Sequence, residues 1–476
     1  MFKETGKTIT LTYVLILVGL FTTIYVWVNT PKVFGLYFFF LLPLSFTVCC
    51  AAFHGILPYH RGGWGLKVLY TVILVRYVVI PFFTSSLGLF GNLLRYSPEA
   101  CNYGVFMQVV ELFVTCIVIR FYFAKTYNKC RLKYTSGRKK HYYDNLSAGG
   151  ILVILFSLFV IAQRGIGRML ASMRFLVLSQ SLEEEAIYGY DQWMAHTLQA
   201  FLVIVVTASF QLREDKKPSA FNIIIPLLFA FLSCSVSFGN NRMTSVYYAV
   251  SAIATLFVAF PHRKAAVLGT IVPTFVVVIV SFTMIKQFGY DVTSTGPTGL
   301  ENDDLVTTLS AYVSTTQNIA KAYDMYGLFG SQMSIANAFS DFIKGIVLLQ
   351  LPFFHGLTAS IRSVPTSIAL ASTGTEVVPM AGQALFYGGN LFGWLVDIIF
   401  FVILIRLLLL TDCYSKMEKR LGNKYLLTWI SVTFGMAMTY NLSIIWTSLN
   451  ATPLFTFVAL LINRNIKLSK STYIKY

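Results

Sequence analysis

Five of the arginines that lie between the long apolar runs of this chain are candidates for chemistry. Arg164 and Arg168 are four residues apart, so in a helix they share one face. Arg174 follows them, Arg242 lies in SFGNNRMTS, and Arg362 lies in HGLTASIRSVPTS. A guanidinium group presents a planar fork of N–H donors that matches phosphate oxygens. The five are therefore candidates for binding a diphosphate, and the alternative for each is a structural ion pair with a nearby aspartate or glutamate.

Two further side chains are candidates for proton transfer. His355 and Glu376 both lie in the segment 286–383, between two apolar runs. A general base must lie within reach of the proton that it takes and must titrate near the working pH, as histidine and carboxylate side chains can. We consider His355, Glu376 and Arg242 as catalytic candidates. The alternative for His355 and Glu376 is a hydrogen-bonded polar residue without a catalytic role.

Charged residues also occur inside the apolar runs. Arg76 and Glu111 lie in neighbouring runs, and charges in such places are costly and usually paired. We predict a structural ion pair between them, with a proton path as the alternative. Asp397 follows Gly388 and Gly389. Together with Gly393 these glycines are expected to allow close helix contact, and Asp397 is expected to find a partner in the helix bundle.

Several classes of function lack their sequence signatures. The chain has no Walker loop followed by lysine, no convincing dinucleotide fingerprint and no cluster of metal ligands. The seven cysteines form no paired framework, and several fall in apolar runs. We therefore predict no cofactor and no metal. A transfer reaction on this chain would need a substrate that is already activated, such as a lipid-linked sugar diphosphate.

Composition and apolar runs predict the elements that must position these residues. Of the 476 residues 56% are hydrophobic and only 12% are charged. Runs near 20 residues recur, and each is long enough to cross a membrane as a helix. The sequence predicts an all-α integral membrane protein with about twelve transmembrane helices. The predicted spans are 9–28, 33–53, 68–90, 105–123, 148–163, 197–212, 221–238, 243–261, 265–285, 384–410, 425–446 and 451–463.

The distribution of basic residues predicts an orientation. Most of the 37 lysines and arginines fall in alternate short segments, which the positive-inside rule assigns to the cytoplasm. Both termini are then cytoplasmic, and the net charge of +17 reflects topology rather than binding of nucleic acid. Residues 1–476 form a single polytopic membrane domain. The segment 286–383 becomes a long external loop with short helices inserted in it, and the candidate arginines lie on the external side.

Three stretches resemble one family of membrane enzymes. LVRYVVIPFF is similar to the third span of the Wzy-type oligosaccharide repeat-unit polymerases, which make O-antigen or capsular polysaccharide. SFGNNRMTSVYYAV is similar to their arginine-containing outer turn, and STGTEVVPMAGQALFYGGNLFGWLV to the end of their long loop. The resemblance also covers the layout of most of the chain. One departure is Gln383, where related sequences often carry an acidic residue.

The resemblance implies a metal-independent glycosyltransferase with a C-type bundle and a long external loop, in the bacterial cytoplasmic membrane. It would polymerise undecaprenyl diphosphate-linked glycan at the external face, with arginines binding the diphosphate leaving group. Membrane lipid and a chain-length regulator protein are the further expected partners. Two alternatives stay open. A lipid-linked oligosaccharide flippase or similar transporter is opposed by the long loop and favoured by Arg76 and Glu111, whereas an O-antigen ligase shares nearly all the parts.

Overall fold

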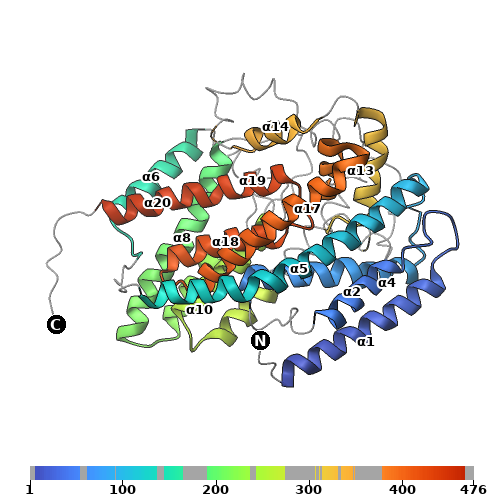
Figure 1. Cartoon of the computed structure of the whole chain (residues 1–476). Helices are drawn as coiled ribbons and strands as arrows, with labels where there is room; N and C mark the ends of the chain where they lie inside the picture. Colours follow the sequence, from blue (N-terminus) through green and yellow to red (C-terminus); the bar gives the residue numbers. More distant parts are fainter. Residues whose placement is uncertain are drawn as a thin grey trace, which may run out of the picture. The chain divides into compact units, whose positions relative to one another are not determined.

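Every element of secondary structure that the computed structural model describes is a helix (Figure 1). The helices fall into two compact units, each formed from segments far apart in the sequence. Unit 1 comprises residues 1–135, 298–413 and 431–447, and unit 2 comprises residues 136–297, 414–430 and 448–476. The structure describes residues 6–53, 62–91, 93–136, 144–163, 190–235, 243–273, 313–330, 334–346 and 378–466, together with 306, 310 and 348.

Unit 1 contains most of the helices that precede residue 136. They are α1 (Gly6–Asn29), α2 (Leu41–Ala52), α3 (Trp64–Leu74), the π-helix η1 (Val75–Val79), α4 (Ile80–Ser86) and α5 (Pro98–Ser136). Later in the chain come α13 (Thr316–Phe329), α14 (Ala336–Lys344) and most of α17 (Met380–Met417). Because α3, η1 and α4 follow one another without a gap, they form one apolar stretch of 23 residues.

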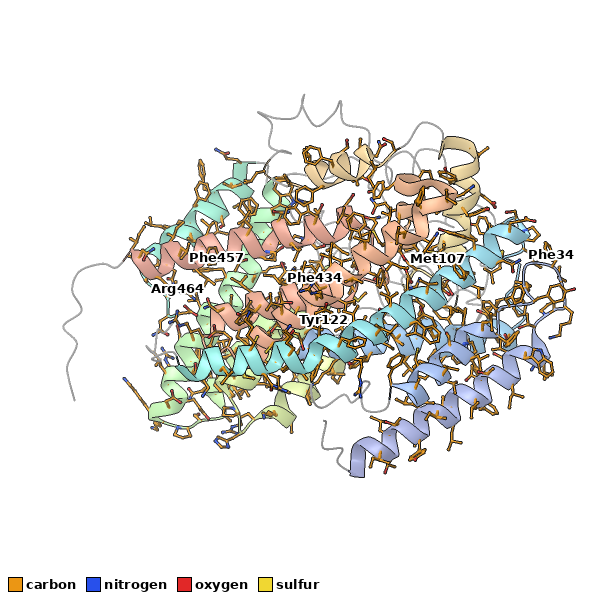
Figure 2. The ribbon with its side chains drawn as sticks, viewed as in Figure 1. Phe34, Met107, Tyr122, Phe434, Phe457 and Arg464 are labelled. Carbon is orange, nitrogen blue, oxygen red and sulfur yellow. The ribbon has the colours of Figure 1, made fainter. Side chains whose placement is uncertain are left out.

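Unit 2 combines the long helix α8 (Tyr190–Lys216) with shorter apolar helices. The shorter helices are α6 (Ala148–Gln163), α9 (Phe221–Ser235) and α10 (Met243–Ala259), with α20 (Thr452–Asn465) packed against α6 and α8. Arg464 near the end of α20, labelled in Figure 2, donates to Asp144 at 2.8 Å. The other carboxylate oxygen of Asp144 accepts from the backbone N–H of Gly422 at 2.8 Å. This ion pair fixes the start of α6 to the last helix of the chain.

Within the described residues, six helices are long and apolar enough to cross a membrane, by length and composition. They are Ile9–Asn29, Trp64–Ser86, Pro98–Cys130, Trp193–Lys216, Met380–Met417 and Leu442–Asn465. Shorter apolar helices cover Leu41–Ala52, Ala148–Gln163, Phe221–Cys234, Thr244–Ala259 and Lys264–Pro273. The chain is therefore an all-helical, multi-pass membrane protein, and the number of twelve spans stays a prediction.

Two predicted span boundaries are wrong. The span predicted at 33–53 becomes helical only at Leu41, because Gly35 adopts a left-handed backbone (φ 99°) close to Pro98 and the residues after it form tight turns. The break predicted just before 451 is found at Ala451, but the span predicted at 425–446 is also interrupted, between the end of α18 (Leu421–Gly435) and the start of α19 (Leu442–Asn450). There the side-chain oxygen of Asn441 accepts from Ile444 N at 2.9 Å and caps the new helix.

The glycines before Asp397 do not serve the helix contact that was predicted for them. Gly389 has φ 68° and ψ −176° and breaks α17 within its length. A Cβ on Gly388 would approach the backbone of Gly393 at 2.8 Å, so the close approach is between the two arms of this one broken helix. Only glycine adopts the left-handed conformation at position 389 without a steric cost. The prediction is therefore corrected: the glycines allow a sharp bend in α17, a few residues before Asp397 in the chain.

Candidate functional site

The residues that the sequence proposes for chemistry all lie outside the described part of the structure. They are the diphosphate-binding candidates Arg164, Arg168, Arg174, Arg242 and Arg362 and the proton-transfer candidates His355 and Glu376. Their assigned roles stay predictions. The described residues instead bring together a second set of polar groups inside unit 1, around Arg76, Glu111 and Asp397.

Arg76 and Glu111 form the centre of this set. Arg76 Nη1 lies 2.6 Å from Glu111 Oε2, and both side chains have no exposed surface. The ion pair that the sequence predicts is thus confirmed. Arg76 lies in η1, a five-residue π-helix, and the next residue, Tyr77, donates its hydroxyl to Gln108 O at 2.5 Å. Single π turns within α-helices are frequent at functional sites because they rotate side chains out of the regular helical register.

Gln108 joins this ion pair to the beginning of α13. Its side-chain amide lies 3.0 Å from the Thr316 hydroxyl. In the amide orientation that satisfies all neighbours, the Gln108 oxygen accepts from Thr316 N at 2.9 Å and from Arg76 Nε at 3.1 Å. The first turn of α13, which lies within the segment 286–383, is therefore held directly against the buried arginine.

Asp397 contradicts the prediction made for it. It is 1% exposed, yet neither of its carboxylate oxygens has a hydrogen-bond partner among the described residues. It does lie within electrostatic reach of Glu111 and Arg76, and of Tyr103 on α5. Arg76 is already bound to Glu111, so its guanidinium group makes no hydrogen bond to Asp397. The expected partner is therefore not found in the described part of the bundle.

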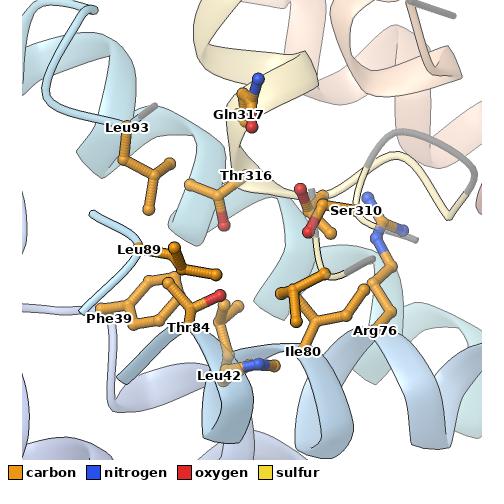
Figure 3. A pocket seen from close by; sticks show the side chains of 13 residues that line it. Phe39, Leu42, Arg76, Ile80, Thr84, Leu89, Leu93, Ser310, Thr316 and Gln317 are labelled. Atoms are coloured by element: carbon orange, nitrogen blue, oxygen red, sulfur yellow. The ribbon is translucent and has the colours of Figure 1, made fainter. Parts of the chain in front are cut away.

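A pocket lies on the other side of Arg76 (Figure 3). It encloses about 420 Å³ of space between atoms, open solvent included. Its polar groups are the Arg76 guanidinium, the hydroxyls of four threonine or serine residues and the side chain of Gln317. The lining residues are Phe39, Leu42, Arg76, Ile80, Pro81, Thr84, Leu89, Leu93, Val306, Ser310, Thr315, Thr316 and Gln317.

Backbone strain shapes the edge of the pocket. Ser314 has φ 49°, a left-handed conformation that is uncommon for residues other than glycine, asparagine and aspartate. Its hydroxyl donates to Thr439 O at 2.6 Å, which holds the strained turn in place. Thr315 follows in extended conformation and α13 begins at Thr316. The strain thereby turns the N-terminus of a 14-residue helix toward the space beside Arg76, and such strain clusters at ligand sites.

The arrangement suits an anion at the pocket. The N-terminus of α13 carries a partial positive charge. Arg76 adds guanidinium N–H donors, with its charge offset by Glu111, and Thr84 and Ser310 add hydroxyl donors. Among the described residues no three His, Cys, Asp or Glu side chains gather closely enough to hold a metal ion.

Sequence reasoning missed the hydroxyls of the pocket. Thr84, Ser310 and Thr316 carry no motif, and the first of them is separated from the other two by more than 200 residues. Arg76 was the one available signal, since a charge in an apolar run requires a partner or a role. Comparison with known protein families, with curated proteins and with solved structures finds no match for the chain.

Proposed function

We propose that this chain is a polymerase of lipid-linked oligosaccharides. It joins repeat units carried on undecaprenyl diphosphate at the external face of the bacterial cytoplasmic membrane. The proposal combines the sequence resemblance, the charge distribution that places both termini in the cytoplasm, and the pocket at Arg76. The reaction needs no nucleotide, because the departing lipid diphosphate supplies the activated bond.

The observation that carries the proposal is the pocket. Its walls come from the ends of α2 and α4 and from the segment 306–317, and the predicted topology assigns all of these to the external side. The pocket combines Arg76, the N-terminus of α13 and several hydroxyls, which together suit the oxygens of a phosphate group. Its apolar walls, from residues such as Phe39 and Leu89, suit the first isoprene units of the lipid.

The roles of the remaining candidates follow from this scheme. Arg164, Arg168, Arg174, Arg242 and Arg362 would stabilise the charge that develops on the departing diphosphate, as preorganised donors do in other group transfers. His355 or Glu376 would take the proton of the acceptor hydroxyl. Membrane lipid and a chain-length regulator protein are the expected partners.

Blocking the pocket tests the proposal. Leu89→Trp places a large side chain in the lining, whereas Leu87→Trp changes an exposed leucine two residues earlier that does not line the pocket. In a strain that lacks the native gene, we expect the Leu87 variant to restore long glycan and the Leu89 variant to leave single repeat units. Purified protein supplied with the host's lipid-linked repeat unit should form a ladder of whole repeats. Equal ladders from both variants would remove the pocket from the reaction.

A transporter of lipid-linked oligosaccharides is the second candidate function. The buried cluster of Arg76, Glu111 and Asp397 favours it, because charges within membrane helices mark ion and substrate pathways. Vesicles that contain the protein separate the two functions. Translocation of the lipid-linked unit without chain extension would support the transporter, and transfer to a lipid acceptor without polymerisation would support the ligase.

A further inference from the structure

The buried cluster of unit 1 is unbalanced in charge. It contains one guanidinium group, on Arg76, and two carboxyl groups, on Glu111 and Asp397. All three residues are 1% exposed. Arg76 lies 2.6 Å from Glu111 and so offsets one negative charge. If both carboxyl groups were ionised, the second charge would have no counter-ion among the described residues that face it.

The surroundings of Asp397 do not stabilise a negative charge. A buried carboxylate normally accepts several hydrogen bonds, yet no described N–H or O–H group donates to either oxygen of Asp397. The titratable and charged groups that face it are Arg76 on η1 and Glu111 and Tyr103 on α5. Of these, Glu111 opposes ionisation of Asp397, and Tyr103 also has a buried hydroxyl without a partner among the described residues.

We propose that Asp397 is a proton-binding site and that this carboxyl group is neutral at physiological pH. An unpartnered neutral carboxyl group in a buried place costs a few kcal/mol, whereas an unpartnered charge costs far more. With one proton on Asp397 the cluster carries no net charge: Arg76 balances Glu111. The inference rests on burial and geometry alone, so it holds whether the chain is a polymerase or a transporter.

A proton fits the site better than a metal cation does. A sodium ion needs a shell of several oxygen ligands, as other hard cations do. Besides Arg76, the described titratable groups in electrostatic reach of Asp397 are Glu111 and Tyr103, and no group of three or more His, Cys, Asp or Glu side chains that could hold a metal ion forms among the described residues. A proton requires only the carboxyl group itself.

Infrared spectroscopy of the full chain in detergent or lipid tests the site directly. We expect a carbonyl stretch of a protonated carboxylic acid at pH 7 that shifts in heavy water and disappears in Asp397→Asn. Asp412→Asn is the matched control, because Asp412 is also buried on α17 but accepts several hydrogen bonds. It should leave the band in place. A wild-type protein without the band, loss of the band in Glu111→Gln but not in Asp397→Asn, or its disappearance on addition of sodium would each overturn the proposal.

The pH dependence of stability gives a second measurement that does not depend on spectroscopy. If the folded protein holds a proton that the unfolded chain releases, stability falls as the pH rises. One such proton changes the unfolding equilibrium about tenfold per pH unit. We expect the wild type to lose stability with this additional slope between about pH 6 and pH 8, a range in which an unfolded carboxyl group is ionised. Asp397→Asn should lack the additional slope, and identical slopes in both proteins would overturn the proposal.

Discussion

Two aspartates on the same helix have opposite surroundings. Asp412 and Asp397 both lie on α17, about 22 Å apart along the axis at 1.5 Å per residue. Asp412 is fully buried and accepts hydrogen bonds from Gly63 N at 2.5 Å, Gly65 N at 2.8 Å, Tyr127 Oη at 2.7 Å and Ser431 Oγ at 2.9 Å. Asp397 is also buried and, within the described structure, accepts none.

The difference separates a structural carboxylate from one with another role. The donors around Asp412 include the first N–H groups of α3, so its charge caps that helix and fixes it to α17. A carboxylate held by this many donors fixes the positions of the segments that supply them. Asp397 accepts no hydrogen bond from the described residues and lies within electrostatic reach of Glu111 and Arg76. It can therefore gain or lose a proton without breaking a described hydrogen bond. Burial alone therefore does not indicate the role of a carboxyl group.

The largest effect is expected from removing the cation near Asp397. Arg76→Met leaves Glu111 buried without its partner, and breaking a buried ion pair in this way costs about 3–5 kcal/mol. The free energy of unfolding, measured by denaturant titration in mixed micelles, should fall by that amount. The double variant with Glu111→Gln should recover most of the loss, because it removes the unpaired charge as well.

Arg406 provides the control for this experiment. It also lies in an apolar helix, but it is exposed and its guanidinium group lies 4.6 Å from the centre of the Tyr122 ring. Arg406→Met should cost about 1 kcal/mol or less, the value of an exposed cation–π contact. Equal losses for both arginines would mean that the Arg76–Glu111 pair is no more important than a surface contact.

The second-largest loss of stability is expected from Asp412→Asn, because Asp412 accepts several hydrogen bonds. In Asp412→Asn one acceptor oxygen is replaced by an NH₂ group that points at other donors, and the remaining charge-assisted hydrogen bonds are weakened. Hydrogen bonds to charged groups contribute about 1.5–3 kcal/mol each, so we expect a loss near 3 kcal/mol. Unchanged stability in the same titration would show that the donors do not depend on the charge of Asp412.

A third buried carboxyl group, on Asp341, accepts a hydrogen bond from the side chain of Gln383. Gln383 Nε2 donates to Asp341 Oδ2 at 2.8 Å, its Oε1 accepts from Leu442 N at 2.8 Å, and Tyr387 donates to the same oxygen of Asp341. An amide both donates and accepts, which a carboxylate cannot do. Gln383→Glu would place two carboxylates in contact and should cost about 2 kcal/mol, within the range for a buried unsatisfied group.

Asp341→Asn in the same chain tests this explanation. The amide introduced at position 341 would donate to the carboxylate introduced at position 383, while Leu442 N would still have an acceptor. The double variant should therefore regain part of the lost stability in the same titration. No recovery would mean that the loss arises elsewhere. The result bears on the resemblance as well, because an acidic residue at 383 would then require a different residue at 341.

The contrast within α17 also shows what sequence can predict here. Apolar runs fix the length and order of most helices, and the cost of a buried charge led to the correct pairing of Arg76 with Glu111. The hydrogen-bond surroundings of Asp397 and Asp412 were out of reach, because the donors to Asp412 come from residues up to 349 positions away. Gly35 misled one span boundary and Gly389 put an unpredicted bend inside another span, since a left-handed residue stops or bends a helix without changing local hydropathy.

The smallest effect is expected from Asp397→Asn, the counterpart of Asp412→Asn on the same helix. Asp397→Asn replaces a neutral carboxyl group, which accepts no described hydrogen bond, by a neutral amide of nearly equal shape. At about pH 4, near the pKa of an unfolded aspartate, the unfolded wild-type chain also holds much of the proposed proton, so the free energies of unfolding of the variant and the wild type should agree within about 0.5 kcal/mol. A loss as large as that of Asp412→Asn would mean that Asp397 is charged and held by Arg76. The two variants of one helix, measured side by side, thus decide whether the absence of described donors around Asp397 reflects a bound proton.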